Sequence, residues 1–402
     1  MKHVVVVIPL LKKIRVIGDF DSNLRSKVPF DNLVCAFLNK LSIEISHYKK
    51  IREYPDLKAF SFWIRKKNIE IFKNKYDDEN YRLGKGILFH ITPSSIPMNF
   101  AYSFVFGLLS GNLNIIRIPS KNFFQINIFL KILDKVLNLK KYRQIKRMNL
   151  FIRYSKDKKI NDYLSLLCDV RIIWGGNNSI NEIRQSNLKP KAFDLTFYDR
   201  YSIALINSNI VNNLQSNDLK ILANHFYNDT YYIDQNACSS PHLIIWVGKN
   251  ITKAKNYFWG EVNSLVNSKY IFEEAAIVDK YSLLLKNLTK LKNISSLNTN
   301  NSKLYRISID KIDNFDNLVR GKWGMFFEYE SDNINFLKKI VESNFQTLSY
   351  FGFNKNYLKD YIISNSLRGI DRIVPIGQTL SMDLVWDGYD IIKILSRKIN
   401  FK

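Results

Sequence analysis

One segment of the chain, residues 85–122, limits the possible folds more than any other. It reads KGILFHITPSSIPMNFAYSFVFGLLSGNLNIIRIPSKN. Two short apolar runs, GILFHI and NIIRIP, have the pattern of strands buried on both faces. The apolar segment 98–110 between them has helical length and ends before Gly111, which favours the end of a helix. A strand, a helix and a strand in this order predict two parallel strands joined by a right-handed crossover.

The same alternation continues along the chain and predicts an α/β fold in both halves. Further helices are expected at 122–139, 161–168, 218–226 and 252–268, with an amphipathic closing helix from Asp387. Further strands are expected at 148–154, 170–174, 192–199, 202–207 and 242–248. The Asn- and Ser-rich segment 293–303 is expected to be a connection.

A glycine pair follows the expected strand 170–174, in the sequence GGNNSINEIR. Gly175 and Gly176 would permit a tight turn, and Ser179 with Glu182 three residues later has the spacing of a capping box at the start of a helix. Such a turn directs backbone N–H groups at one point, where a phosphate can bind. Many turns that serve only the fold have the same sequence pattern, so both interpretations stay open here.

Size and composition restrict the class of protein. The 402 residues, of which 46% are hydrophobic, suffice for two domains with separate cores. Three dispersed cysteines without a CxxC pair indicate a reducing cytoplasm rather than a disulfide framework, and five scattered histidines predict no metal site. The apolar runs fall short of a membrane span. Residues 4–13, VVVVIPLLKK, are expected to form a strand rather than a signal peptide.

The chain is strongly basic, with 60 Lys and Arg against 36 Asp and Glu, a net charge of +24. Such a charge suits nucleic acid, a membrane surface or phosphorylated ligands. The lysines are spread along the whole chain, however, and the densest basic stretch, 139–149, is interpreted as a solvated connection. We therefore expect no nucleic-acid partner.

One cysteine stands in an unusual setting. Cys35 and Cys168 lie in apolar segments, where a thiol behaves as a small hydrophobic group. Cys238 lies instead in the polar run DQNACSSPH between an expected helix and an expected strand. A thiol in such a place is a candidate nucleophile. His242, four residues later, would lower the pKa of the thiol if it were close, but it is expected simply to begin the strand.

Five segments in this order resemble the LuxC-like acyl-CoA reductases, a branch of the aldehyde dehydrogenase superfamily. They cover residues 89–122, 172–184, 193–202, 234–244 and 368–392. The resemblance implies a Rossmann-like nucleotide-binding domain beside an α/β catalytic domain with the nucleophilic cysteine near its start. It implies a nucleotide domain at 1–206, a catalytic domain at 207–385 and a C-terminal helix at 386–402.

The resemblance also implies site residues. Catalytic residues would be Cys238, Ser95 and Asn236, with Ser95 at the place of the superfamily's side-chain oxyanion donor and Asn99 one turn further on. Cofactor-binding residues would be Thr92, Pro93, Arg117, Ser120, Lys121, Trp174, Gly175 and Gly176. Lys121 stands where members that use NADH commonly have a glutamate, which favours NADPH. The superfamily's glutamate base is missing from FDLTFYDRYS; Asp194 or Asp199 is a weaker alternative.

The implied activity is reduction of an acyl thioester to an aldehyde through an acyl group on Cys238, with hydride from NADPH. The acyl donor would be acyl-CoA or an acyl carrier, and an acyl-transferring partner protein and a homo-oligomer are expected. Two alternatives stay open. The enzyme could run in the oxidative or CoA-acylating direction, or the chain could be an inactive dehydrogenase scaffold that serves as a basic binding module.

Overall fold

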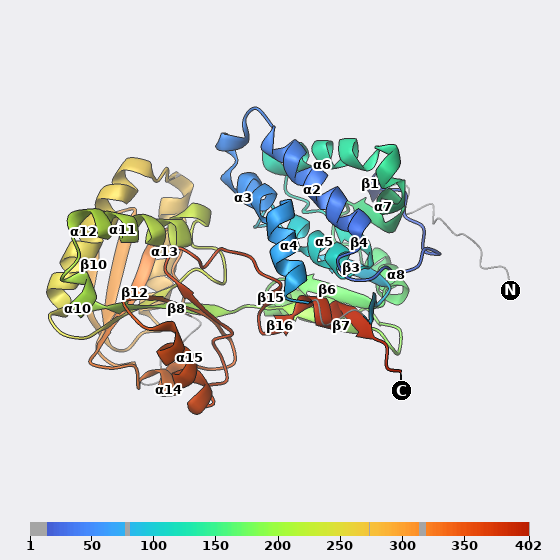
Figure 1. Cartoon of the computed structure of the whole chain (residues 1–402). Coiled ribbons are helices and arrows are strands. Elements are labelled where there is room, and N and C mark those ends of the chain that lie inside the picture. Colours follow the sequence, from blue (N-terminus) through green and yellow to red (C-terminus); the bar gives the residue numbers. More distant parts are fainter. Residues whose placement is uncertain (1–13, 77–80, 273, 313–318, 402) are drawn as a thin grey trace. The chain divides into compact units, whose positions relative to one another are not determined.

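The computed structural model describes residues 14–76, 81–272, 274–312 and 319–401, and divides the chain into two compact units (Figure 1). The first unit comprises residues 1–198 and 384–402, and the second comprises residues 199–383. The strand expected at 4–13 lies outside the described residues.

The first unit is built on a six-stranded sheet with the order β1-β5-β4-β3-β6-β7. Its strands are β1 (Arg15–Ile17), β3 (Ile87–Ile91), β4 (Leu113–Arg117), β5 (Asn149–Ile152), β6 (Val170–Trp174) and β7 (Phe193–Phe197). All neighbouring pairs are parallel except β1 with β5. Every residue of β3, β5 and β6 is buried, because helices cover both faces of a parallel sheet.

Helices and two small strand pairs complete this unit. The helices are α2 (Asn32–Ser46), α3 (Pro55–Trp63), α4 (Lys66–Asn74), α5 (Asn99–Leu109), α6 (Phe124–Leu137), α7 (Arg143–Met148), α8 (Lys158–Leu167), α9 (Asn177–Arg184) and α16 (Ile391–Leu395). The strand pairs are β2 (Arg82–Gly84) with β17 (Ser396–Lys398), and β15 (Val385–Trp386) with β16 (Tyr389–Asp390). The strand, helix and strand expected at 85–122 are β3, α5 and β4.

The second unit contains a seven-stranded sheet with the order β10-β11-β12-β9-β8-β13-β14, parallel except for β10. Its strands are β8 (Tyr201–Asn207), β9 (Leu243–Val247), β10 (Ile294–Asn301), β11 (Leu304–Ile309), β12 (Met325–Ser331), β13 (Phe345–Phe351) and β14 (Arg372–Pro375). Its helices are α10 (Ser208–Val211), α11 (Ser216–Thr230), α12 (Ile251–Lys269), α13 (Glu274–Leu288), α14 (Leu337–Ile340) and α15 (Lys355–Ser364). Alternate residues of β8 and β9 enter two separate hydrophobic cores, one on each face of the sheet.

The structure differs from the sequence-based expectations at three places. The polar segment 293–303 is not a plain connection: it contains β10, an edge strand that pairs with β11 through backbone groups. The closing segment is not one helix from Asp387, because a strand pair precedes the five-residue α16 and β17 follows it. The first unit ends at Tyr198 rather than near residue 206, because β8 pairs with β9 and β13 of the second sheet.

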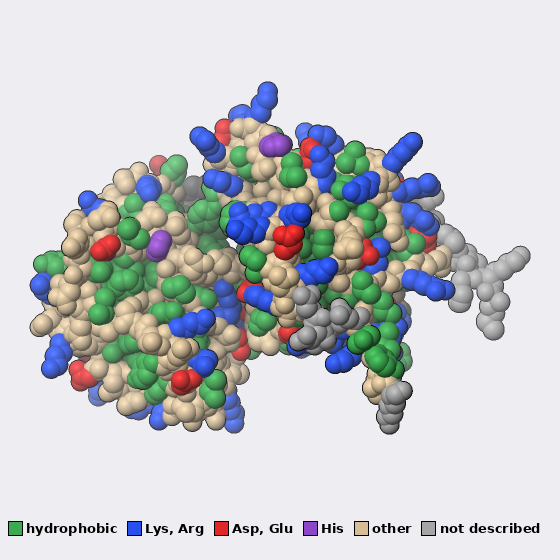
Figure 2. Space-filling view, in the orientation of Figure 1, with side chains coloured by type: hydrophobic (Ala, Val, Ile, Leu, Met, Phe, Trp, Pro, Cys, Tyr) green, Lys and Arg blue, Asp and Glu red, His purple; other side chains and the backbone are tan. Residues whose placement is uncertain are grey.

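Two surface properties bear on possible partners. On the face drawn in Figure 2, lysine and arginine side chains are scattered over the surface and interspersed with acidic and neutral ones. Within the described part of the chain, no helix is both long and apolar enough to cross a membrane.

Candidate active site

The strand order of the first sheet locates a ligand-binding edge. The chain leaves β3 toward β4 on one side and later returns to place β6 on the other side of β3. In open α/β sheets, ligands bind outside the carboxyl ends of the strands at such a reversal. The eight residues predicted to bind the cofactor lie at this edge: Arg117 and Trp174 end β4 and β6, and the other six lie in the segments that follow β3, β4 and β6.

The segment after β6 is more open than expected. Gly176 is the N-cap of α9 with φ −66° and ψ 158°, an ordinary extended conformation, and Ser179 lies inside the first turn. The predicted capping box and the predicted glycine-dependent turn are therefore wrong. The first helical bond runs from the Ile180 N–H to the Gly176 carbonyl, so the N–H groups of 177–179 have no partner within the helix. A Cβ at Gly175 would meet nothing nearer than Ser179 Cβ at 3.6 Å, so the glycine leaves free space.

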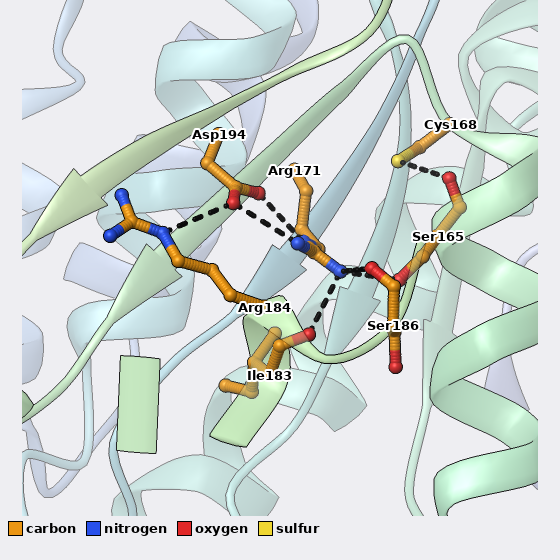
Figure 3. Close-up of polar contacts among 7 residues, drawn as sticks. All are labelled: Ser165, Cys168, Arg171, Ile183, Arg184, Ser186 and Asp194. Atoms are coloured by element: carbon orange, nitrogen blue, oxygen red, sulfur yellow. Dashed lines mark hydrogen bonds and ion pairs between the residues drawn. The ribbon is translucent and has the colours of Figure 1, made fainter. Parts of the chain in front are cut away.

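The other end of α9 is fixed by a buried arginine (Figure 3). Arg171 on β6 donates to the carbonyl oxygens of Ile183 and Ser186 at 3.0 and 2.8 Å. Its guanidinium also forms a two-fold ion pair with Asp194, with distances of 2.7 and 3.0 Å. Both Asp194 oxygens are therefore engaged in an ion pair, which makes this carboxylate a poor candidate for the base.

The other candidate base, Asp199, is followed by Arg200. Arg200 pairs with Asp371 and donates to the carbonyl oxygen of Phe345 at 2.7 Å.

Trp174, predicted to bind the cofactor, is buried, and a chain of hydrogen bonds that crosses the sheet begins at its side chain. Its Nε1 donates to Ser103 Oγ at 3.1 Å, and Ser103 is 2.8 Å from His90 Nδ1. His90 Nε2 is 3.1 Å from Asn114 Oδ1, and Asn114 donates to Asn149 Oδ1 at 2.8 Å. Burial lowers the pKa of His90 to about 4, so its ring is neutral and can link donor and acceptor. The Trp174 side chain thus sets the position of the end of β6.

The segments after β3 and β4 contact each other. Thr92 Oγ1 donates to the Arg117 carbonyl at 3.4 Å, and Ser120 Oγ lies 3.5 Å from Ser94 Oγ. The Arg117 guanidinium stacks over the Tyr154 ring at 4.5 Å. Lys121 is exposed, with Nζ 5.0 Å from the Phe123 ring, and no ion pair is found for it among the described residues. Of the two predicted cations, Lys121 is the one free to meet a ligand.

The candidate oxyanion donors lie in the same part of the first unit. Ser95 is exposed in the segment after β3, beside the half-buried Pro93. Asn99 is the first residue of α5; it is buried, and its Oδ1 has no hydrogen-bond partner. A buried polar atom without a partner is costly for the protein alone, so this atom is suited to meet a ligand.

Cys238 lies in the second unit, in the turn between the 3₁₀ helix Tyr231–Ile233 and β9. Asp234 and Gln235 both have left-handed backbone conformations, with φ of 55° and 60°. Two successive non-glycine residues in this region are strained and are often found at functional sites. Asn236, predicted to be catalytic, is exposed in this turn and donates from Nδ2 to the Ile233 carbonyl at 3.2 Å.

The turn is held by side chains from its surroundings. The buried Gln235 side chain donates to the carbonyl oxygens of Pro241 and Met325 at 3.0 and 3.1 Å, and accepts the Met325 N–H at 3.3 Å. Ser202 Oγ on β8 donates to the Cys238 carbonyl at 2.6 Å. These contacts bind the cysteine segment to strands β8 and β12.

The three thiols differ in environment. Burial raises the pKa of Cys35 to about 11 and that of Cys168 to about 12, which leaves almost no thiolate near neutral pH. Cys238 is half-buried. Burial, with the nearby charges of Arg320 and Lys322, lowers the pKa of His242 to about 3, so this ring is neutral and supplies no positive charge to the thiol.

Comparisons with known proteins agree with this architecture. Residues 66–259 match the family model of acyl-CoA reductases (LuxC). Among curated proteins, none matches this sequence. Aldehyde dehydrogenase 21 from Physcomitrella patens, in complex with the reaction product succinate, has a TM-score of 0.64 at 10% identity, over 91% of this chain and 84% of that one.

Two further solved structures are similar. Glyceraldehyde-3-phosphate dehydrogenase GapN from Methanocaldococcus jannaschii, complexed with NADP, has a TM-score of 0.63 at 12% identity, over 96% of this chain and 97% of that one. A mutant of aldehyde dehydrogenase C from Pseudomonas syringae, complexed with NAD+ and octanal, has a TM-score of 0.60 at 10% identity, covering 90% and 80% of the respective chains. At these identities the likeness establishes the fold.

The chain therefore has the fold of the aldehyde dehydrogenases, and fold and family together define an aldehyde-related oxidoreductase. The match of residues 66–259 to the acyl-CoA reductase (LuxC) family model confirms the resemblance seen in the sequence. Sequence reasoning missed Gln235, Ser202 and the chain of hydrogen bonds through His90. No sequence signal indicated Gln235, because its partners are backbone atoms of Pro241, six positions away, and of Met325, 90 positions away.

Proposed function

We propose that this protein reduces an acyl thioester to an aldehyde, with Cys238 as the nucleophile that receives the acyl group. The observation that carries the proposal is the contrast among the thiols. Cys238 lies half-buried in a strained polar turn attached to two strands, whereas burial keeps the other two thiols protonated. Cys35 is also half-buried, but its raised pKa leaves almost no thiolate near neutral pH, so Cys238 is the thiol best suited to act as a nucleophile.

Acyl transfer would exchange one thioester for another. The Cys238 sulfur, as thiolate, attacks the acyl carbonyl carbon; a new C–S bond forms, the donor's C–S bond breaks, and the CoA or carrier thiol leaves. The two thioesters are of similar energy, so this step costs little free energy. The resulting acyl group stays on Cys238 until hydride reduces it and the aldehyde departs, which restores the thiol.

The carboxyl edge of the first sheet has features that fit a nicotinamide dinucleotide, which supplies a hydride equivalent when bound. Gly175 leaves free space, the N–H groups of 177–179 are available to an anion, and Asn99 Oδ1 lacks a partner. Arg117 and Ser120 would lie beside the adenosine ribose, and the exposed Lys121 would meet a 2′-phosphate. These features support NADPH as the cofactor; the similar GapN structure is itself complexed with NADP.

The reductive direction is supported by the absence of the superfamily's glutamate base. The segment matching the superfamily's glutamate, FDLTFYDRYS, contains no glutamate, and the Asp194 carboxylate is engaged by Arg171. An acyl group protected from activated water is available for reduction instead. Ser95 would donate a hydrogen bond to the carbonyl oxygen of the acyl group. Asn236 would help to hold the turn that contains Cys238. The three free cysteines favour a reducing compartment such as the cytoplasm.

Mass spectrometry of the protein after incubation with a series of acyl-CoAs, without nucleotide, tests the proposal. We expect one added acyl group, mapped to Cys238, followed by aldehyde release when NADPH is added. Acyl groups on Cys35 or Cys168 would contradict the assignment of the nucleophile. Carboxylate as the product would instead identify an oxidative dehydrogenase, and no adduct from any donor would favour an inactive scaffold.

A further inference from the structure

A buried carboxylate lies next to the cysteine segment. Asp229, in the last turn of α11, is only 1% exposed. Its Oδ2 accepts the N–H of Gly377 at 2.6 Å, and its Oδ1 accepts the N–H of Thr379 at 3.0 Å. Both donors lie in the loop after β14, part of the fifth segment that resembles the family. One side chain thus holds this loop with both of its oxygens.

The backbone at the same place holds the nucleophile's segment. The carbonyl oxygen of Asp229 accepts a hydrogen bond of 2.7 Å from Ser240 Oγ, and Thr230 next to it accepts the Gln235 N–H at 2.7 Å. Gln235 and Ser240 lie on either side of Cys238. The end of α11 therefore connects the loop after β14 to both sides of the cysteine turn.

We propose that Asp229 is a positioning residue for Cys238: its ionised carboxylate clamps the loop 376–379 onto the end of α11, and so fixes the turn that presents the thiol. The inference rests on the proposed function, because the step affected is acylation of Cys238. We call the two hydrogen bonds from Gly377 and Thr379 the Asp229 clamp.

The clamp depends on ionisation. Burial raises the pKa of Asp229 to about 6, against the opposing effect of the two backbone N–H groups and of Arg372. Protonation converts one acceptor oxygen into a donor that faces an N–H group, so the clamp loosens on acidification.

Stability changes in the opposite direction. An unfolded aspartate titrates near pH 3.9, so between about pH 4 and 6 the folded state binds more protons than the unfolded state. The contribution of Asp229 to stability therefore increases as the pH falls through this range. On acidification we therefore expect the two hydrogen bonds of the Asp229 clamp to weaken while the contribution of Asp229 to the free energy of unfolding does not decrease.

Two other ionisable groups face the same loop. Arg372 on β14 donates to the carbonyl oxygens of Thr379 and Ser381 at 3.0 and 2.9 Å. The His225 ring on α11 packs against Gly377, where an added Cβ would lie 2.8 Å from His225 Cγ. His225 is the other ionisable side chain next to Gly377, so a His225→Gln variant is the matched control.

The first experiment measures single-turnover acylation of Cys238 from pH 5 to pH 8, without nucleotide, with a saturated acyl-CoA as the probe. In Asp229→Asn the side-chain oxygen can still accept one of the two backbone N–H groups, but the other carboxylate oxygen is replaced by an NH2 group, which donates. We expect the wild-type rate to decrease near pH 6; in Asp229→Asn we expect acylation at pH 7.5 to be at least tenfold slower and this decrease to be absent. His225→Gln should retain that decrease. Wild-type rates in Asp229→Asn, or a decrease with the same midpoint, would overturn the inference.

The second experiment needs no variant and no activity. Hydrogen exchange of the wild type, corrected for intrinsic rates, should show at least tenfold less protection of residues 376–381 at pH 5 than at pH 7.5. Unchanged protection would overturn the clamp. If protection decreases as expected but no acyl group is ever transferred to Cys238, the proposed function is wrong while the clamp itself stands.

Discussion

Ser202, on β8, donates a hydrogen bond of 2.6 Å to the carbonyl oxygen of Cys238. The same hydroxyl oxygen accepts the N–H of Thr347 on the neighbouring strand β13 at 3.2 Å. One buried hydroxyl thus connects the peptide unit of the nucleophile to two central strands of the second sheet. Catalytic groups held by regular elements are positioned more firmly than groups held by loops alone.

We expect Ser202→Ala to slow acylation of Cys238 roughly three- to tenfold and to reduce the free energy of unfolding by about 1 to 3 kcal/mol, because two buried backbone groups lose their partner. Ser349→Ala is the matched control: Ser349 is buried on β13, and its hydroxyl donates to the Ile203 carbonyl at 3.2 Å. Denaturant unfolding and single-turnover acylation would be compared. Equal acylation rates in the two variants would contradict a positioning role for Ser202.

Cys238→Ser should abolish aldehyde formation, with at least a hundredfold loss, because a serine hydroxyl lacks a thiolate fraction and forms no thioester. Folding should be unchanged, since the side chain is only half-buried. Aldehyde would be measured together with thermal unfolding. The controls Cys35→Ala and Cys168→Ala should keep the reaction, and Cys168→Ala should lose stability because its thiol is buried.

Much of the architecture could be predicted because it depends on apolar runs. The strands β3, β4 and β6 are nearly continuous apolar sequences, which is the pattern of a parallel sheet covered on both faces. β10 could not be predicted in this way, because its side chains are largely polar and exposed, and it forms through backbone pairing with β11. Backbone hydrogen bonds between strands do not require an apolar or alternating pattern of side chains, so the sequence does not indicate them.

Only those parts of the candidate site that depend on residue type and on neighbours in the sequence could be predicted. Cys238 could be singled out by its polar setting. The role of Asp229 could not, since its partners are backbone N–H groups in a loop 148 and 150 positions away. The start of α9 was misplaced because Gly176 caps the helix without a side chain, whereas Ser179 has the sequence of a cap but lies within the first turn.

Gly175→Val should raise the apparent KM for the nucleotide about tenfold or more while leaving acylation of Cys238 unchanged. The structure makes this position more informative than Gly176, because a Cβ at Gly175 meets only Ser179, at 3.6 Å, and the fold should tolerate it. Gly260→Val, where an added Cβ also meets nothing within 4 Å, is the control and should change neither quantity. Steady-state kinetics and acylation assays would be run in parallel. Equal loss of both steps in Gly175→Val would indicate a structural role for the segment.

Lys280 on α13 should make stability depend on pH. Its ammonium is buried, donates to the carbonyl oxygens of Ser302 and Trp323 at 2.8 Å each, and lies 4.0 Å from the Tyr305 ring centroid. Burial lowers its pKa to about 7, whereas the unfolded chain keeps this proton to about pH 10. The unfolded state therefore binds more protons above pH 7, so the contribution of Lys280 to stability rises with pH there.

Between pH 7 and pH 9, the wild type should therefore gain roughly 2 to 3 kcal/mol of unfolding free energy relative to Lys280→Met. Denaturant unfolding at several pH values would measure the difference. Lys286→Met, on the exposed face of the same helix, should show no such change relative to the wild type. A pH-independent difference for Lys280→Met would mean that the lysine stays charged in the folded protein.

Lys121→Glu should reverse the cofactor preference. Lys121 is exposed at the carboxyl edge of the first sheet, and no ion pair is found for it among the described residues, whereas Arg117 is stacked on Tyr154. A charge-assisted contact to a 2′-phosphate is worth about 1.5 to 3 kcal/mol, or roughly ten- to hundredfold in preference. We expect kcat/KM for NADPH to fall by about this factor and that for NADH to stay similar or improve, because a carboxylate repels the phosphate and accepts hydrogen bonds from ribose hydroxyls.

Lys131→Glu on α6 makes the same charge change at an exposed site away from that edge, and should leave the ratio of the two kcat/KM values unchanged. A wild type that prefers NADH, or equal effects of the two variants, would show that Lys121 contributes only general surface charge.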